Sequence, residues 1–230
     1  MQAKEIQPKL KSLRQEASSI DPCLARKLDE INRWVKDVKP GSLTAKKFVM
    51  AFLLEVIRDS KVWLKIKALP SQEEQQSKFE QMTPSERYWY SYLFPKWLSQ
   101  TDPKFWLWKQ KLMAGEFNQA DDHVIKSIAT EIVQRECTFW HCYVVDLSMA
   151  TDLIVSSSQK KPLCIQVTSI SEEFLQQKYA DWENTLQNWG INRGLFLSYN
   201  PRISNFVNQL VNIALDNSDN LRVGSYLKFP

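Results

Sequence analysis

Apolar side chains recur at helical spacing through the first half of the chain. Residues 6–17 form a short amphipathic pattern, and Asp21-Pro22 reads as a helix cap followed by a proline at the first helical position. A further helix is predicted over residues 43–66, where large apolar side chains follow one stripe. Two capping boxes, each a hydroxyl residue followed three positions later by glutamate, start more helices: Ser71 with Glu74, and Thr83 with Glu86.

The pattern changes in the second half, where short apolar runs alternate with helical stretches. Runs bounded by turn residues are typical of strands, and Gly190 suits the left-handed end of a helix. The predicted order is α, β, β, β, α, β, α, β. The elements are a helix over 120–136, strands over 138–147, 152–157 and 163–169, a helix over 171–189, a strand over 195–199, a helix from 201 to about 215, and a strand over 221–229.

These patterns predict two parts of different class. Residues 1–118 form an all-α domain, and residues 119–230 form an α/β domain of the mixed α+β kind. Two domains, or one large one, are consistent with a length of 230 residues and a hydrophobic content of 43%. No clear linker divides the halves near residue 118, so the independence of the helical half stays open.

Charge is divided unevenly between the halves. Residues 1–119 carry seven more basic than acidic side chains, and residues 120–230 carry three more acidic than basic, in agreement with the net charge of +4. A basic half joined to an acidic half suggests that one part meets a polyanion while the other holds carboxylates for another purpose. The alternative is a solvated helical surface rich in lysine.

Several classes of protein are disfavoured by composition. The five glycines form neither G-x-G-x-x-G nor G-x-x-x-x-G-K, which argues against nucleotide-cofactor enzymes and P-loop NTPases. Two histidines and no G-x-S-x-G leave little for a hydrolytic triad. No run of about 18 uncharged apolar residues occurs and residues 1–10 lack an apolar signal core, so we expect no membrane span and a cytoplasmic location.

The four cysteines lie at irregular spacing, which favours reduced thiols. Zinc is the sharper alternative, because Cys137, His141 and Cys142 are neighbours. No C-x-x-C occurs, however, and the only other histidine is His123, so four well-placed ligands are lacking. Ordinary strand cysteines are the favoured interpretation.

The strongest chemical signal comes from two neighbouring strands. Asp152 opens an apolar strand, and after a polar turn the next strand carries Gln166-Val167-Thr168. Side chains alternate along a strand, so Gln166 and Thr168 share one face. Magnesium prefers hard oxygen ligands, which Asp152, the Gln166 amide and the Val167 main-chain carbonyl can supply. The pattern predicts a site for Mg²⁺ or Mn²⁺. Asp146, just before this strand, is either a turn residue or an extra ligand.

Over residues 120–200 the chain resembles the PD-(D/E)xK, or restriction-endonuclease-like, superfamily. The family pattern is a helix carrying an acid, a hairpin whose second strand begins with aspartate, a strand with (Glu/Gln)-x-Lys, a helix and a strand. Glu131, with Glu136 as second choice, would be the helical acid, Asp152 the aspartate, and Gln166-Val167-Thr168 the triplet. Some active members, including transposon-end endonucleases, also have glutamine here. The resemblance implies a Mg-dependent DNA endonuclease that cuts phosphodiester bonds with metal-activated water.

The chain departs from the family at the last triplet position. Family members use that lysine to orient water and stabilise charge on the phosphate, and Thr168 carries no charge. Some members move the lysine to the following helix, where Lys178 lies in this sequence. Lys160 and Lys161 lie in the turn between the strands, which is expected to be too far away. Two outcomes remain open: a cleaving enzyme with a migrated lysine, or a fold that has lost its reaction.

Aromatic residues are dense between residues 88 and 108 and alternate with lysines and an arginine. Aromatic rings beside cations can stack bases and hold phosphates, so single-stranded nucleic acid is one expected ligand. The alternative is that most rings are core. The rivals to the nuclease are therefore an inactive nucleic-acid-binding module and a subunit that binds a protein partner through its helical half.

Overall fold

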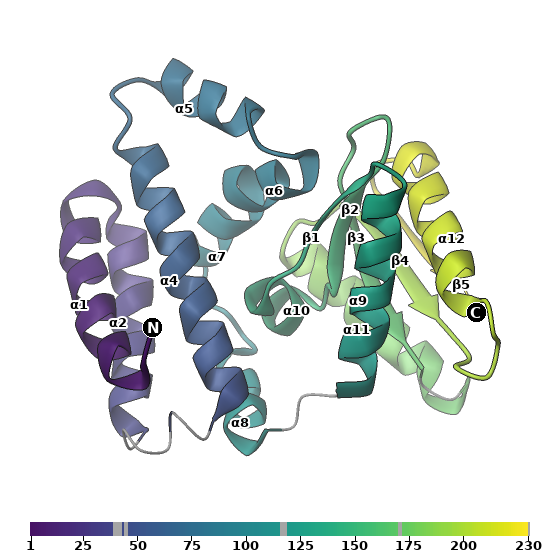
Figure 1. The fold of residues 1–230 in the computed structure, drawn as a ribbon, viewed down its shortest axis with the longest axis horizontal. Helices are drawn as coiled ribbons and strands as arrows, with labels where there is room; N and C mark the ends of the chain where they lie inside the picture. Colours follow the sequence, from purple (N-terminus) through teal and green to yellow (C-terminus); the bar gives the residue numbers. More distant parts are fainter. Residues whose placement is uncertain (39–42, 44–45, 116–118, 170–171, 230) are drawn as a thin grey trace. The chain divides into compact units, whose positions relative to one another are not determined.

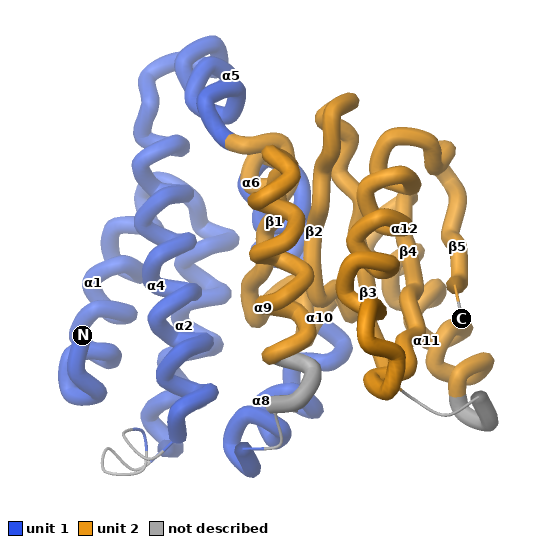
Figure 2. Tube along the Cα trace, turned by 45° about the vertical axis from the view of Figure 1, so that its right-hand side comes forward, with its two compact units in different colours: residues 1–82, 90–117 blue, residues 83–89, 118–230 orange. Residues whose placement is uncertain are grey.

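The chain divides into two compact units. The computed structural model describes residues 1–38, 43, 46–115, 119–169 and 172–229. Residues 1–82 and 90–117 form one unit, and residues 83–89 join residues 118–230 in the other (Figure 2). The segment 83–89 belongs to the second unit through Ser85, whose hydroxyl contacts the carbonyl of Thr138 at 3.1 Å.

Unit 1 is built from helices, as the apolar spacing predicts (Figure 1). Asp21 caps one helix with its Oδ1, which accepts from the amides of Cys23 and Leu24 at 2.9 and 3.2 Å, and its Oδ2 accepts from Trp63 Nε1 at 2.7 Å. Ser71 also caps a helix as predicted, through the amide of Glu74. The helices are α1 (Ala3–Ile20), α2 (Pro22–Asp37), α4 (Lys47–Lys67), α5 (Gln72–Glu80), α7 (Phe94–Ser99) and α8 (Phe105–Ala114), and α7 is preceded by the π-helix η1 (Trp89–Leu93).

Most of the aromatic stretch is core. Tyr90 and Trp108 are buried and donate hydrogen bonds to the carboxylates of Asp59 and Asp102, at 3.0 and 2.9 Å. Buried rings fill the unit because each removes a large apolar area from water. Trp106 and Tyr92 are exceptions, with exposed fractions of 62% and 38%.

Unit 2 is a five-stranded mixed sheet with helices on both faces. The strand order is β1-β2-β3-β4-β5; β1, β2 and β3 pair antiparallel, and β4 and β5 continue parallel to β3. The strands are β1 (Thr138–Trp140), β2 (Leu153–Ser156), β3 (Leu163–Thr168), β4 (Arg193–Ser198) and β5 (Ser225–Phe229). The helices are α6 (Pro84–Tyr88), α9 (Gln119–Gln134), α10 (Tyr143–Met149), α11 (Glu172–Asn188) and α12 (Phe206–Asn220). The mixed α/β class is therefore as predicted.

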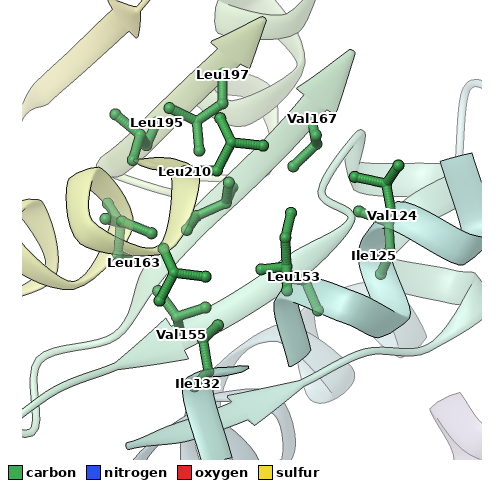
Figure 3. Close-up of a cluster of buried hydrophobic side chains, with 14 residues drawn as sticks. Val124, Ile125, Ile132, Leu153, Val155, Leu163, Val167, Leu195, Leu197 and Leu210 are labelled. Carbon is green, nitrogen blue, oxygen red and sulfur yellow. The ribbon is translucent and has the colours of Figure 1, made fainter. Parts of the chain in front are cut away.

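Alternation along β3 separates two environments. Leu163, Ile165 and Val167 point into a cluster with apolar side chains of α9 and α12 (Figure 3). The opposite face is covered by α11, which comes so close to β4 that a Cβ on Gly194 would lie 2.4 Å from Leu186 Cδ1. Gln166 therefore faces α11, while its neighbours in the strand build the core.

The predicted strand over residues 138–147 is wrong in its second half. The strand ends at Trp140, and residues 143–149 form the helix α10, which buries Val144, Val145 and Met149. Val144 and Val145 are β-branched and favour strands locally, but burial of one helical stripe overrides the local preference. The last helix and strand also begin later than predicted, at Phe206 and Ser225.

Two tryptophans of the α11 segment belong to the core. Trp182 lies in α11 and Trp189 directly follows it, and each is 2% exposed. Trp189 Nε1 donates to the carbonyl of Ser148 at 2.8 Å. Gly190 has the predicted left-handed backbone, with φ of 59°. None of the described helices is long and apolar enough to cross a bilayer.

Candidate active site

Asp152 and Gln166 lie opposite each other on neighbouring strands. The β2–β3 register pairs Leu153 with Ile165 and Ile154 with Cys164, and one step further the Asp152 amide donates to the Ile165 carbonyl at 2.8 Å. Residues directly opposite in an antiparallel pair point to the same face. Gln166 Nε2 accordingly donates to Asp152 Oδ2 at 2.6 Å. The two side chains that the sequence predicts to converge are in contact.

The connection from α10 to β2 aims the Asp152 side chain. Ala150 ends α10 in the left-handed region, with φ of 49°, and the Thr151 amide returns to the carbonyl of Val145 at 3.2 Å. His141 holds the next peptide, because its Nδ1 lies 2.7 Å from the Asp152 carbonyl. Backbone on both sides of Asp152 is therefore fixed, and the carboxylate is carried on a rigid support.

Val167 presents its main chain to the same carboxylate. Its amide donates to Asp152 Oδ2 at 2.6 Å. The amide and the carbonyl of one strand residue point to the same side, so the Val167 carbonyl also faces β2. Val167 follows Gln166, so this carbonyl lies one residue beyond the Asp152–Gln166 pair. Asp152 Oδ1 accepts no hydrogen bond from any residue that the structure describes. Gln166 Nε2 lies 2.6 Å from Asp152 Oδ2 and 3.4 Å from the Val167 carbonyl, so both oxygens lie around the same amide nitrogen.

Lys178 of α11 meets the third triplet residue. Its Nζ donates to Thr168 Oγ1 at 2.7 Å, and Thr168 is 3% exposed. Thr168 and Gln166 share the face that α11 covers. The Lys178 ammonium group therefore lies beside the side chain of residue 168, on the same face as Gln166. The positive charge is also close enough to lower the pKa of Asp152, against the larger effects that raise it.

The charged form of Asp152 is disfavoured by its surroundings. Its pKa is raised well above the ordinary 3.8 by burial and by the negative charge of Asp146, and lowered by the Val167 amide, His141 and Lys178. Burial in a medium of low dielectric penalises charge, and a nearby like charge adds to the penalty. A cation placed beside Asp152 and Asp146 would relieve both effects.

The oxygen atoms at this point fit a magnesium ion better than zinc. Among the described residues, no three histidine, cysteine, aspartate or glutamate side chains gather to hold a metal. Mg²⁺ needs less from the protein, because it keeps several waters and is bound through one or two carboxylates and neutral oxygens. Asp152 and the Val167 carbonyl would hold it, with Asp146 close enough to contribute charge. The Gln166 amide would join them only through its oxygen, whereas here its Nε2 faces Asp152 Oδ2 and the Val167 carbonyl.

Glu131, predicted as the helical acid, lies in a different environment. Its carboxylate forms an ion pair with Arg135 at 3.0 Å, and Arg135 continues to Asn208 and Asn212 of α12. Glu136, the second choice, follows α9 and is exposed. The structure brings together Asp152, Gln166, Val167, Thr168 and Lys178, and it places Glu131 in the contact between α9 and α12.

The two turn lysines are held away from this cluster. Lys161 Nζ contacts Gln159 Oε1 at 2.6 Å and the Asp219 carbonyl at 3.5 Å, and the turn itself is tied to the Asp219 carboxylate through Ser158 and the Gln159 amide. Both lysines are exposed at the far end of the β2–β3 hairpin from Asp152. Lys178 is therefore the lysine whose ammonium group reaches the site.

Sequence reasoning missed the part of His141 and underestimated Asp146. Asp146 lies in the first turn of α10, and its charge acts on Asp152 only because α10 folds back toward the start of β2. His141 contributes through a contact with a main-chain carbonyl. Asp146 has no sequence signal for this role, because it depends on a helix that the local pattern does not predict. His141 follows β1, whose register pairs Trp140 with Ile154, and this register brings it beside the start of β2.

No protein family, curated protein sequence or solved structure matches the chain.

Proposed function

We propose that the chain is a metal-dependent nuclease of the PD-(D/E)xK type in which Lys178 replaces the lysine missing from the Gln166-Val167-Thr168 triplet. The observation that carries the proposal is the 2.7 Å contact between Lys178 Nζ and Thr168 Oγ1. It supports a migrated lysine because Lys178 brings a positive charge from α11 to Thr168, the triplet position at which family members have their lysine.

The order of elements gives independent support. Helix α9, strands β1, β2 and β3, helix α11 and strand β4 follow in the family's order, with α10 as an additional helix between β1 and β2. Aspartate stands at the start of the second strand and the triplet ends the third, as in the family pattern. A short motif gains weight when the surrounding elements agree with it.

Each residue has a task in hydrolysis of a phosphodiester. A bound Mg²⁺ would neutralise phosphate charge and supply a water nucleophilic near neutral pH. Asp152 and the Val167 carbonyl would hold that ion, and the hydrogen bonds from Val167 and Gln166 keep the Asp152 carboxylate in one orientation. Lys178 would stabilise the negative charge that builds on the phosphate oxygens. The expected substrate is nucleic acid, with DNA favoured by the family resemblance.

Cleavage by the purified chain tests the proposal. Labelled DNA incubated with Mg²⁺ or Mn²⁺ should be cut or nicked, and Asp152→Asn should abolish cutting. Lys178→Ala should lower the rate by about 10²- to 10³-fold, as for loss of one preorganised charge donor. Lys161→Ala is the matched control, because Lys161 lies in the hairpin turn. Full cutting by Asp152→Asn would remove the site assignment.

A second candidate is an inactive module that binds nucleic acid through the same fold. It is favoured by the two hydrogen bonds that Asp152 Oδ2 accepts, since these hold that oxygen without a cation. Such a module would not cut DNA with either metal. Its affinity for DNA would still fall steeply with rising salt, because binding releases the counterions of the DNA. Absence of cutting under both metals together with that salt dependence would select this candidate.

A further inference from the structure

Unit 1 contains a groove that is lined by basic side chains and by an exposed aromatic ring. The groove has a volume of about 620 Å³ and is formed by α2, by the end of α7 with the residues that follow it, and by α8. This volume is in the range of ligand-binding clefts. All of its lining residues belong to unit 1, so the groove is described without reference to unit 2.

One stripe of α2 supplies most of the charge. Arg26, Glu30, Arg33 and Asp37 follow at intervals of four, three and four residues, which places them on one side of the helix. Both arginines are exposed. Arg26 Nη2 contacts Cys23 Sγ at 3.6 Å, and Arg33 forms a solvent-accessible ion pair with Asp29 at 3.3 Å. Exposed guanidinium groups remain available to phosphate oxygens, which they match in geometry.

Lysines complete the basic lining of the groove. Lys109 of α8 lies over the ring of Phe105, with its Nζ 4.4 Å from the ring centre, and Lys27 lies over Trp97 and pairs with Glu30 at 3.3 Å. The groove thus holds four cationic side chains against two carboxylates. The surplus of positive charge favours an anionic ligand.

Trp106 gives the groove its second property. Its side chain lines the groove, is 62% exposed, and makes no hydrogen bond or ring contact within the part of the chain that the structure describes. Phe105 beside it is partly buried, and Trp34 and Trp108 are buried, so this indole is more exposed than the rings nearby. An exposed ring beside cations can stack on a nucleic-acid base, but only on a base that is not already stacked in a duplex.

We propose that this groove binds a single-stranded nucleic-acid segment, with a base stacked on Trp106 and the adjoining phosphates held by Arg26 and Arg33. The site is distinct from the Asp152 cluster and does not depend on cleavage there. Its ligand class is an unpaired polynucleotide, either DNA or RNA, because stacking and phosphate contacts are common to both.

Binding measured in EDTA tests this site, because cutting at a metal site cannot occur. Fluorescein-labelled oligo-dT and oligo-U of about 12 nucleotides, a length in the range of single-strand binding sites, would be titrated with the full chain and followed by anisotropy. Trp106→Ala should raise Kd about 10-fold for the oligomer that binds, and Trp106→Phe should recover most of the loss. Arg26→Ala and Arg33→Ala should each lower the slope of log Kd against log salt by about 0.7.

Matched controls separate the groove from general attraction. Leu107→Ala removes an exposed apolar side chain next to Trp106, and Lys61→Ala removes an exposed cation of α4; both lie outside the groove lining, and neither should change Kd by more than about twofold, the scale of one weak surface interaction. Unchanged binding by Trp106→Ala, or equally tight Trp106-dependent binding of a 12-base-pair duplex, would overturn the proposal. Loss of affinity in the arginine variants alone would also overturn it, since an acidic peptide or general charge attraction would then explain the result. If the chain cuts DNA but shows no Trp106-dependent binding, only the proposal for the groove fails. If it binds through Trp106 but does not cut, only the nuclease proposal fails.

Discussion

Asp152 and Gln166 face each other across β2 and β3, and one carboxylate oxygen, Oδ2, accepts from both Gln166 Nε2 and the Val167 amide at 2.6 Å. These hydrogen bonds fix the orientation of the carboxylate. Burial and Asp146 nevertheless raise its pKa. A group that is held firmly but disfavoured in its charged form is expected where a cation binds, because the cation removes the electrostatic cost.

Asp152→Asn should therefore stabilise the folded chain in the absence of metal. The raised pKa means that the folded state holds the Asp152 proton to higher pH than the unfolded state does. The stability that this group contributes is present below the ordinary 3.8 and is lost as pH rises through the folded pKa. In EDTA the Tm of the variant should exceed that of the wild type by a margin that grows with pH. Thermal unfolding at pH 5 and pH 8 measures this margin.

Addition of Mg²⁺ provides the control for that experiment. The ion should raise the Tm of the wild type and leave that of Asp152→Asn nearly unchanged, since a ligand stabilises only the state that binds it. A variant with a lower Tm than the wild type at pH 8 in EDTA would contradict the assignment of electrostatic cost to Asp152.

Gly194→Ala should destabilise unit 2. The added Cβ would lie 2.4 Å from Leu186 Cδ1 and 2.7 Å from Trp182 Cη2, so α11 must move away from β4. Overpacking of this kind costs about 1–3 kcal/mol. Gly224→Ala is the comparison, because Gly224 has open space around it and only a left-handed φ of 80° to oppose the substitution. Urea unfolding should give the larger loss for position 194; equal losses would argue against close packing of α11.

Arg193→Lys should also destabilise unit 2. The guanidinium of Arg193 donates to the carbonyls of Pro162, Asn217, Ser218 and Leu221 at 2.6–3.2 Å, which joins the β2–β3 turn to the end of α12. Lysine has one ammonium group and cannot reach four carbonyls at once. Left without partners, buried carbonyls cost about 1–3 kcal/mol. A denaturation midpoint equal to that of the wild type would show that water replaces these contacts.

Thiol labelling of the folded chain should distinguish two pairs of cysteines. Cys142 and Cys164 are buried, and burial raises the pKa of the Cys164 thiol to about 12, whereas Cys23 and Cys137 are partly exposed. The thiolate is the reactive form, so Cys164 should resist iodoacetamide at pH 8 until the chain unfolds. Mass spectrometry of the modified peptides identifies the sites. Rapid modification of Cys164 in the native chain would contradict its position beneath α11.

The strand pair of the candidate site could be predicted because its signal is local. Asp152 begins one apolar run, and Gln166 is a polar residue inside the next, so alternation places Gln166 with Thr168 on one face. That Asp152 meets Gln166 depends in addition on the register of the two strands. The helix α10 could not be predicted in this way, since Val144 and Val145 favour a strand until tertiary burial decides otherwise. Asp146 joins the site only through that helix.

Which rings are buried and which are exposed could also not be predicted from the sequence. Trp106 and Trp108 are two residues apart in one helix, so they lie on opposite sides of it, but the local pattern does not tell which side is buried. Trp108 packs against rings of α2 and α4 and donates to Asp102, whereas Trp106 lines the groove and is 62% exposed. Packing against elements far away in the chain decides which ring is core.

Exchange of the two residues at the Lys178–Thr168 contact tests the central claim most directly. Lys178→Thr should lower the DNA cleavage rate in Mg²⁺ by about 10²-fold or more, as for loss of a preorganised charge donor. The double variant Thr168→Lys with Lys178→Thr conserves both side chains and returns the lysine to β3, so cutting should recover to within about 10-fold of the wild type, a barrier difference of about 1.4 kcal/mol. Equal Tm values ensure that both variants are folded. Cutting by Lys178→Thr at the wild-type rate would contradict the account.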